Sequence, residues 1–574
     1  MLALIAGAAV GLLAMMAAGL AGTLALGPIR VGVHDYVKPL IWGGAAAVAL
    51  LLIDWQRPTW RRAGIAALAA LGSLGLVNFA ASAAPIVTDA DIAVGELYVE
   101  LATRGQLLVG PFSRFGWHHP GPLYFYLTAP FYALAGHHAA AMYGVAVAIN
   151  LAALTTMVWV LAREAKGPTA AIVVGAVLLF AWRVPRFLAS PWTAHVPILP
   201  GLAFLVLAAA VASGRWRLLP LTIAFGSFVA QTHVGSLPVV VAITAAVSIS
   251  VILGGRSPWP VLNASAWVLA LLWLVPISEA VSHGGGNLTV LWRFFVTESG
   301  PSHSIREAIE YGTFGLAGVL RPDLELPWGG HVEISGVAWN VLAAIVMTLL
   351  LAILARRHFT DGRRFEGSLA LVVLTATAIN LWALTRIRGD ILSHELFRLS
   401  AIGALDLGIL VAAAVSAIPG RFVDWIARPV VARVSIAFVL LLAVAVAIRD
   451  LDSLTSFERR QQEHSSIVPA FTAIRDYLVA TGVRRPLIRV GEDRGADAAG
   501  VLLRLLQDGR SAAVMDADRI LFTEAFAATG DEDALVTIAD PQLHRTVREQ
   551  PGTAVLLEAD PVFVDAVRIA PTRR

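Results

Sequence analysis

The chain alternates between long apolar runs and short polar segments. Several apolar runs reach the roughly 20 residues that a helix needs to cross about 30 Å of hydrocarbon. With shorter runs included, the pattern predicts about 13 transmembrane helices. They lie near residues 2–27, 38–54, 62–84, 138–162, 168–181, 195–213, 219–232, 236–253, 262–280, 336–355, 367–385, 398–417 and 433–448. The sequence therefore predicts an all-α polytopic membrane domain over residues 1–448.

From Arg449 onward the pattern changes, because no later apolar run is long enough to cross a membrane. Short β-rich pieces alternate there with helix-like pieces, which is typical of a small α/β domain. The β-rich pieces are 487–490, 512–515, 534–538 and 553–557, and the helix-like pieces are 496–507 and 542–550. We expect residues 449–574 to form a soluble domain outside the membrane.

Composition agrees with a membrane protein. Hydrophobic residues make up 57% of the 574 residues and charged residues only 14%, and the mean hydropathy is +0.73. These values exclude an ordinary soluble globular protein. The formal net charge of +3 gives no indication of nucleic-acid binding. The chain has no cysteine, which excludes disulfides, thiolate metal sites and a cysteine nucleophile.

Basic residues gather in short loops between the apolar runs. Lys and Arg in such loops mark the cytoplasmic side of a membrane protein. The loops are 55–62, 163–166, 214–217, 254–256 and 356–364. With these loops inside, alternation places the polar segment 85–137, the loop 281–335 and the C-terminal domain outside. We therefore expect a multi-pass protein of the plasma (inner) membrane with its active site on the outer face.

The acidic candidates in the first outer segment are Asp89, Asp91 and Glu96. Asp91 and Glu96 are five residues apart, about 140° around a helix, so they would not share a face, whereas Asp89 and Glu96 would. If a helix begins after Asp91, the helix dipole favours the ionised form of that aspartate. The alternative is that one of the aspartates only caps the helix.

Cations and aromatic residues follow in the same segment. Arg114, His118 and His119 could neutralise a phosphate near the headgroup level, and Tyr124 lies beside them as a further substrate-binding candidate. The alternative is that the arginine and aromatic side chains only anchor the loop in the interface. The two histidines could also be a metal pair, but the sequence shows no further ligands nearby. We predict no metal site and no cofactor, and the sequence leaves open whether a divalent ion assists.

Other ionisable residues lie at the outer ends of the expected spans. His195 and His233 interrupt apolar sequence, which is costly in a membrane unless the side chain faces a cavity or a partner. A second polar cluster occupies residues 386–398. Its candidates for phosphate binding are Arg386, Arg388, His394 and Arg398. The alternatives are helix–helix hydrogen bonds for the histidines and ion pairs with Asp390 and Glu395 for the cluster.

The order of these motifs resembles the GT-C glycosyltransferases, a superfamily that includes the protein O-mannosyltransferases and the lipid A aminoarabinose transferase. The motifs are most similar to those of GT-C-like membrane proteins of actinobacterial type. The matching segments are 91–97 (DIAVGEL), 104–111 (RGQLLVGP) and 113–126 (SRFGWHHPGPLYFY). Segments 190–197 (SPWTAHVP) and 231–238 (QTHVGSLP) and the C-terminal domain are similar to the same group.

The resemblance implies transfer of a sugar from a polyprenyl-phosphate donor to a glycan, lipid or protein acceptor of the cell envelope. It ranks Asp91 above Asp89 as the general base, with Glu96 beside them. A lipid phosphate leaves readily once its charge is balanced, so one carboxylate suffices as base, and Arg114, His118 and His119 would stabilise the phosphate. The family often has Lys where this chain has His119.

Two other functions compete with glycosyl transfer. A transporter or flippase for a lipid-linked glycan would carry its polar residues near mid-membrane, whereas the densest polar residues here lie in the expected outer loops. A GT-C-shaped scaffold without activity could instead bind glycolipid through the C-terminal domain.

Overall fold

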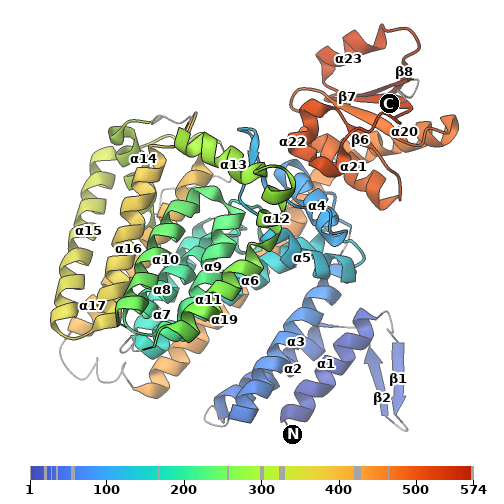
Figure 1. Ribbon diagram of the computed structural model, residues 1–574. Helices are drawn as coiled ribbons and strands as arrows, with labels where there is room; N and C mark the ends of the chain where they lie inside the picture. The colour runs from blue at the N-terminus through green and yellow to red at the C-terminus, as the bar shows by residue number, and fades with distance from the viewer. Residues whose placement is uncertain are drawn as a thin grey trace. The chain divides into compact units, whose positions relative to one another are not determined.

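The computed structural model describes residues 2–18, 22–26, 29–33, 36–53, 58–83, 85–165, 168–184, 186–254, 257–297, 303–321, 330–418, 428–462 and 465–569 (Figure 1). The chain divides into two compact units. Unit 1 comprises Met1–Leu107, Phe125–Ala148 and Leu454–Arg574. Unit 2 comprises Leu108–Tyr124 and Ile149–Ser453. The polar segment 85–137 therefore contributes to both units.

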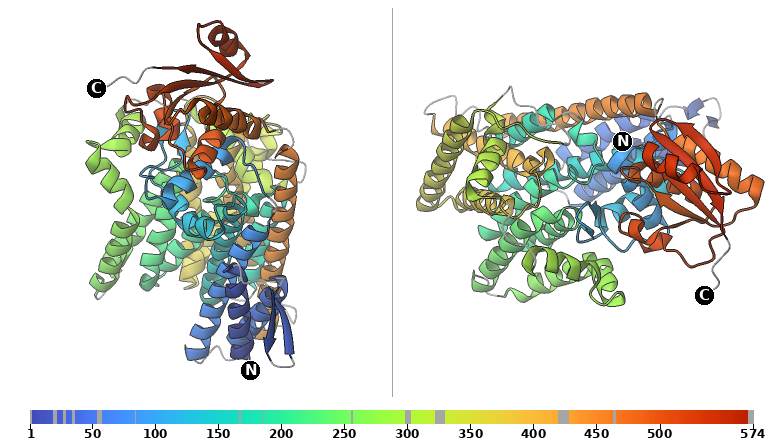
Figure 2. Two further views of the ribbon diagram at one scale, coloured as in Figure 1. Left: turned by 90° about the vertical axis from the view of Figure 1, so that its right-hand side faces the viewer. Right: turned by 90° about the horizontal axis from the view of Figure 1, so that it is seen from above.

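Unit 2 is a bundle of apolar helices that pack against one another. Its main pairs are α7 (Thr169–Arg183) with α17 (Ser393–Ala417), α8 (Ile198–Ala212) with α9 (Leu219–Thr232), and α15 (Val337–Thr360) with α16 (Arg364–Leu384). Its other helices are α10 (Leu237–Gly254), α11 (Trp259–Leu272), α12 (Leu274–Ser282), α13 (Gly286–Trp292) and α14 (Ile305–Ala317). The boundaries between the two units fall inside α6 (Ala140–Glu164) and α19 (Pro429–Gln462), so each of these helices begins in one unit and ends in the other. Figure 2 shows the helices of unit 2 in two further views.

The described part of the chain contains six helices that are long and apolar enough to cross a membrane. A seventh span results if α11 and α12, which meet at a bend of 55°, are counted as one. The six are Ala140–Glu164, Val234–Gly254, Val337–Thr360, Arg364–Leu384, Ser393–Ala417 and Val434–Leu454. Each of the other expected spans overlaps a further helix. The protein is thus a multi-pass membrane protein.

The loops expected on one side of the membrane meet at one end of unit 2. A cavity of about 320 Å³ is lined there by Glu164 and by residues 213–215 and 361–366. Arg215 donates to Glu164 over 2.7 Å, and a Cβ on Gly254 would contact the Trp216 ring at 3.1 Å. Four of the five basic loops therefore cluster, as a shared membrane side requires.

The expected bounds of the first span are wrong. Within the first predicted span, 2–27, the described residues form helix α1 over Leu2–Ala17. It is followed by a hairpin of β1 (Gly22–Leu26) and β2 (Ile29–Val33). The sequence between these strands is Gly-Pro, a turn former, and β2 is rich in β-branched residues, which favour strands. The loop 281–335 contains helices α13 and α14, while its residues 298–302 and 322–329 lie outside the described part.

Unit 1 begins with three helices, α1, α2 (Val37–Ile53) and α3 (Pro58–Ser82), which pack around a core that includes Leu13 and Leu71. It continues with α4 (Ala90–Thr103) and α5 (Leu123–Leu134). The rest of the unit is the C-terminal segment, in which α20 (Ile467–Thr481), α21 (Gly495–Gln507), α22 (Arg519–Phe522) and α23 (Pro541–Arg548) accompany a β-sheet.

The C-terminal sheet has five strands in the order β6-β5-β7-β9-β8. Strands β5, β6 and β7 run parallel, and β9 pairs antiparallel with both β7 and β8. Their bounds are β5 (Pro486–Val490), β6 (Ala513–Val514), β7 (Ala534–Ala539), β8 (Ala554–Ala559) and β9 (Val562–Arg568). Each of the four β-rich pieces expected from the sequence overlaps one of these strands; β9 was not predicted.

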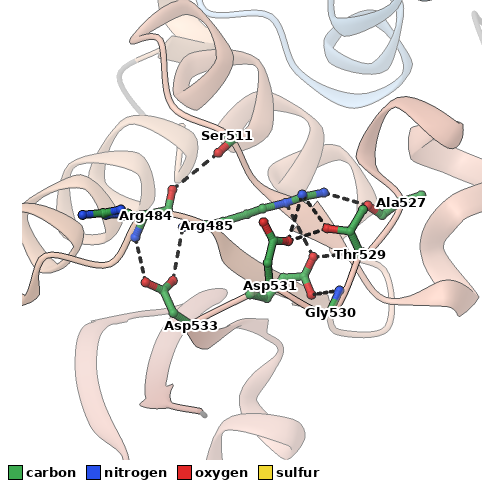
Figure 3. Close-up of polar contacts among 9 residues, drawn as sticks. Arg484, Arg485, Ser511, Ala527, Thr529, Gly530, Asp531 and Asp533 are labelled. Carbon is green, nitrogen blue, oxygen red and sulfur yellow. Dashed lines mark hydrogen bonds and ion pairs between the residues drawn. The ribbon is translucent and has the colours of Figure 1, made fainter. Parts of the chain in front are cut away.

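A polar network fixes the start of strand β5 (Figure 3). The backbone N–H groups of Arg484 and Arg485 donate to the carboxylate of Asp533 over 3.0 and 3.1 Å. The Arg485 guanidinium donates to Thr529 Oγ1 and Asp531 Oδ1 in the loop before β7. These hydrogen bonds hold the loop before β7 against the start of β5, the strand with which β7 pairs.

Helix α21 of the C-terminal segment packs against α4 within unit 1. Tyr98 Oη donates to the Leu521 carbonyl over 2.8 Å, and the Arg104 guanidinium donates to the Leu506 carbonyl over 3.0 Å. The acidic helix of the first polar segment and the α/β segment therefore belong to one packed body.

The two ends of α16 provide a test of the membrane arrangement. The helix has 21 residues and is about 31 Å long at 1.5 Å per residue, and the exposed Asp361 and Asp390 lie in the loops at its opposite ends. Because the natural chain has no cysteine, D361C and D390C each introduce a single thiol. In sealed vesicles of one orientation, we expect a membrane-impermeant maleimide to label only one of the two. Equal labelling of both would contradict the arrangement, and the unmodified protein is the blank.

Candidate functional site

Three segments that are distant in sequence meet in unit 2. They contribute His119 from the HHPGP motif, His233 from the end of α9, and Glu395 and Arg398 from the first turns of α17. We call these four residues the histidine–arginine cluster. His394 and Trp192, whose rings lie 5.3 Å apart, border it. The cluster brings together three of the phosphate-binding candidates from the sequence.

His119 is held by the backbone around it. Its N–H donates to the Pro111 carbonyl over 2.8 Å, and its Nδ1 accepts the Val234 N–H over 2.9 Å. The short hairpin of β3 (Phe112–Ser113) and β4 (Trp117–His118) precedes it. A Cβ on Gly110 would lie 2.4 Å from the His119 carbonyl oxygen, so only glycine fits there. Pro111, before the motif, and Val234, after α9, therefore fix the position of the His119 imidazole.

His233 faces Arg398. Its Nδ1 lies 3.0 Å from Arg398 Nη1 and 3.2 Å from the Gly235 N–H, and its ring centre is 4.8 Å from that of His119. A Cβ on Gly235 would lie 2.7 Å from Arg398 Nη2. The absence of a side chain at Gly235 thus leaves the space that the guanidinium occupies.

Arg398 is a largely buried charge with one carboxylate partner. Its side chain is 13% exposed, and Nη2 lies 3.7 Å from Glu395 Oε2. His394 Nε2 lies 3.5 Å from Glu395 Oε1. Among the described residues, Arg398 Nε and Trp117 Nε1 are buried donors without a hydrogen-bond partner. Buried donors in native proteins are normally satisfied, so these two are available to an acceptor.

Burial favours the neutral form of both imidazoles of the cluster. Burial lowers the pKa of His119 to about 3, against an opposing effect of Glu395. Burial also holds the pKa of His233 well below its usual range, and Arg398 acts in the same direction. Since each Nδ1 accepts a backbone N–H, the ring proton resides on Nε2. Both histidines are therefore neutral donors, not the cations that the sequence suggested for His119.

His195 and Tyr124 support the cluster from outside it. His195 is fully buried, its Nδ1 lies 2.8 Å from Ser190 Oγ, and its ring packs 4.8 Å from that of Phe397; burial lowers its pKa to about 3. Tyr124 Oη donates to the Pro191 carbonyl over 3.1 Å. This bond ties the HHPGP motif to the segment that carries His195.

The other candidate cations lie elsewhere. Arg388 packs over the Phe294 ring at 4.1 Å, Arg386 lies 5.8 Å from the Trp382 ring, and the exposed Arg114 lies 5.0 Å from the Phe115 ring. The His118 ring contacts that of Phe112.

Sequence reasoning missed a clamp on the two histidines. Asn287 Oδ1 accepts the His118 N–H over 2.8 Å, and its Nδ2 donates to the His118 and His119 carbonyls over 2.9 and 3.4 Å. The Asn287 N–H in turn donates to Glu279. Glu279 lies just before the loop 281–335 and Asn287 lies inside it. One asparagine among small polar residues gave no signal in the sequence.

The acidic candidates lie on α4, in unit 1. Asp89 is the N-cap, because its side chain accepts the Ala90 N–H over 2.6 Å. Asp91 is exposed in the first turn, two residues beyond this N-cap, so the helix begins before Asp91 and not after it. Ala90, between them, has φ +49°, a left-handed conformation that costs roughly 1–3 kcal/mol and tends to mark functional sites. The capping interpretation therefore holds for Asp89.

Glu96 is buried on the opposite side of α4. It accepts hydrogen bonds from Thr88 Oγ1 over 2.6 Å and Tyr132 Oη over 2.8 Å. Burial nevertheless raises its pKa, against the lowering effects of these hydroxyls and of Arg504. Asp91 and Glu96 thus face apart, as their spacing predicted.

Among the described residues, no group of three or more His, Cys, Asp or Glu side chains is arranged to hold a metal ion.

Comparisons with known proteins give structural neighbours only. No family model and no curated sequence matches. The chain is similar in structure to ArnT from Cupriavidus metallidurans. For the apo form the TM-score is 0.48, and for the form bound to undecaprenyl phosphate it is 0.49. In both, identity is 14%, over 88% of this chain and 98% of that one.

A second neighbour is the arabinosyltransferase EmbB from Mycobacterium smegmatis. Its TM-score is 0.27 and its identity 16%, over 74% of this chain and 46% of that one. The kind of protein that the motifs resemble is thus present among the structural neighbours.

The raised pKa of Glu96 predicts a pH-dependent effect of E96Q. Because the folded-state pKa lies above the unfolded one, the buried carboxyl favours the folded state most when protonated, below its unfolded value of about 4.5. Its contribution declines as the pH rises through the folded pKa. We expect E96Q to raise the Tm relative to the natural protein at pH 8, and the difference to shrink toward pH 5. Thermal unfolding at both pH values tests this; a Tm difference that grows toward pH 5 would contradict it.

Proposed function

We propose that the protein is a membrane glycosyltransferase that moves a sugar from a polyprenyl-phosphate donor to a cell-envelope glycan, lipid or protein acceptor. The observation that carries the proposal is the histidine–arginine cluster. It combines one permanent cation, two neutral N–H donors and buried donors that lack a partner. Such a set suits a phosphate, which offers several acceptor oxygens and negative charge.

Arg398 takes the role first given to His119 and Arg114. A guanidinium stays charged at every physiological pH and offers several donors in a fixed plane. Glu395 balances part of its charge, which lowers the cost of burying the cation. The neutral Nε2–H groups of His119 and His233 add hydrogen bonds without adding charge. We assign the departing phosphate of the donor to this set.

The reaction needs one base. As the acceptor oxygen forms its bond to the anomeric carbon, the bond from that carbon to the phosphate oxygen breaks and the phosphate keeps the electron pair. The acceptor hydroxyl proton passes to a carboxylate, which we assign to Asp91. Its exposure at the start of α4 suits contact with a substrate, whereas Asp89 is engaged as the N-cap.

We place the cluster on the outer face of the membrane. The basic loops gather at one end of α8 and α9, beside Arg215 and Trp216, whereas His195 and His233 mark the other ends of these helices. Lys and Arg mark the cytoplasmic side, so the cluster belongs to the opposite one. Lipid-linked donors are the plausible substrates there, because nucleotide sugars are cytoplasmic.

Substitution of the aspartates tests the catalytic assignment. We expect D91N to lower transfer from a labelled polyprenyl-phosphate sugar by about 10²–10⁴-fold, the usual contribution of a general base, and D89N to have a smaller effect. D476N removes an exposed carboxylate from α20 and is the matched control. If neither D91N nor D89N slows transfer in proteoliposomes, the assignment is wrong. Labelled lipid that crosses the bilayer without transfer would favour a transporter instead.

Gly235 offers a test of the phosphate site without removing any charged group. An added methyl group must displace the Arg398 guanidinium. We expect G235A to weaken binding of a labelled polyprenyl phosphate by roughly tenfold or more, the worth of one charge-assisted hydrogen bond. The matched control is G201A in α8, where a Cβ would meet only a Val229 methyl at 4.0 Å. Equal binding by G235A and G201A would contradict the assignment.

A further inference from the structure

A second polar cavity lies in unit 1, and its lining includes none of the groups assigned to the phosphate. It measures about 160 Å³ and is bounded by the start of the first polar segment and by helix α21. Its polar wall contains Glu96, His137, Arg504 and Gln507. Neither the phosphate site nor the base at Asp91 uses this cavity.

Donors and acceptors alternate along the polar wall. Each oxygen of Glu96 accepts one hydroxyl, from Thr88 and from Tyr132. Gln507 Nε2 donates to the same Tyr132 hydroxyl over 3.0 Å. A carboxylate oxygen can accept more than one hydrogen bond, and an amide both donates and accepts. The wall therefore retains hydrogen-bonding capacity toward the cavity.

The charges around the cavity are nearly balanced. Arg504 opposes the charge of Glu96. The second buried carboxylate, Glu100, is already paired, with His137 Nδ1 at 2.6 Å and Arg104 Nη2 at 2.9 Å. A free anion would meet the carboxylates, and a free cation would meet the arginines. The cavity is therefore better suited to a neutral ligand with many hydroxyl groups than to an ion.

The remaining wall is apolar. Val87 precedes α4, and Ile467 and Leu503 come from the C-terminal segment. An apolar patch opposite polar groups matches the C–H face and the hydroxyl edge of a sugar ring. At roughly 30 Å³ per water molecule, the space holds about five waters, which is of the order of one monosaccharide.

We propose that this cavity binds one neutral sugar residue, with Glu96, Arg504 and Gln507 contacting its hydroxyl groups. The assignment of this sugar to the acceptor rests on the proposed function. The binding of a sugar ring in the cavity does not depend on it. The C-terminal segment would then supply half of the ring-binding wall, through α21. Glu96 is a binding group in this account, which leaves Asp91 as the base.

Binding can be measured without any transfer reaction. The full-length protein in lipid nanodiscs is titrated with methyl glycosides of arabinofuranose, mannopyranose and galactopyranose, followed by saturation-transfer NMR. We expect at least one glycoside to bind. R504A should weaken it about tenfold or more, through loss of a charged hydrogen bond. L503F should weaken it similarly, because the larger ring enters the cavity while every polar group remains.

Two controls separate the outcomes. R510A removes an arginine of the same segment that pairs with Asp508 and should bind like the natural protein. D91N should also bind normally, so loss of transfer and loss of sugar binding are distinguishable. The proposal is overturned if no glycoside binds, or if R504A and L503F, shown to be folded by their Tm, bind as well as the natural protein. Competition by inorganic phosphate would show an anion site in its place.

Discussion

The buried guanidinium of Arg398 sets the conditions for everything around it. A charge that is only 13% exposed must be compensated, because removing a partner from a buried ion typically costs about 3–5 kcal/mol. Glu395 supplies the opposite charge, and His233 supplies an acceptor nitrogen. A histidine that accepts from a cation cannot itself be protonated at that nitrogen. The neutral state of His233 therefore follows from Arg398, and the missing side chain at Gly235 provides the room.

Segments from four parts of the chain have to reach this point together. Helices α8 and α9 run between the basic loops and the cluster, over about 22 Å in the case of the 15-residue α8. The HHPGP motif is held by Val234 on one side and by the Asn287 clamp on the other. The positions of the donors are thus fixed by backbone bonds from rigid helix ends, which favours a preorganised anion site.

The sequence predicted the positions of helices and strands along the chain better than the contacts between distant segments. Apolar runs and basic loops report local physics, so the helices of unit 2 and the strands β5 to β8 could be located in advance. Glu395 and Arg398 were visible only as one polar stretch, because pairing across 165 residues between His233 and Arg398 leaves no local pattern. The neutral protonation state of His119 could not be predicted from the sequence either, because it depends on burial of the side chain by other segments. The first span was overextended because an apolar run does not distinguish a helix from a hairpin.

The most direct measurement is an experimental structure of the full-length protein with undecaprenyl phosphate. The account predicts that the phosphate lies within hydrogen-bonding distance of the Arg398 guanidinium and of Nε2 of His119 or His233, and that Trp117 Nε1 or Arg398 Nε gains a partner. A phosphate bound instead at Arg114, Arg386 or Arg388, with the histidine–arginine cluster unchanged, would contradict it.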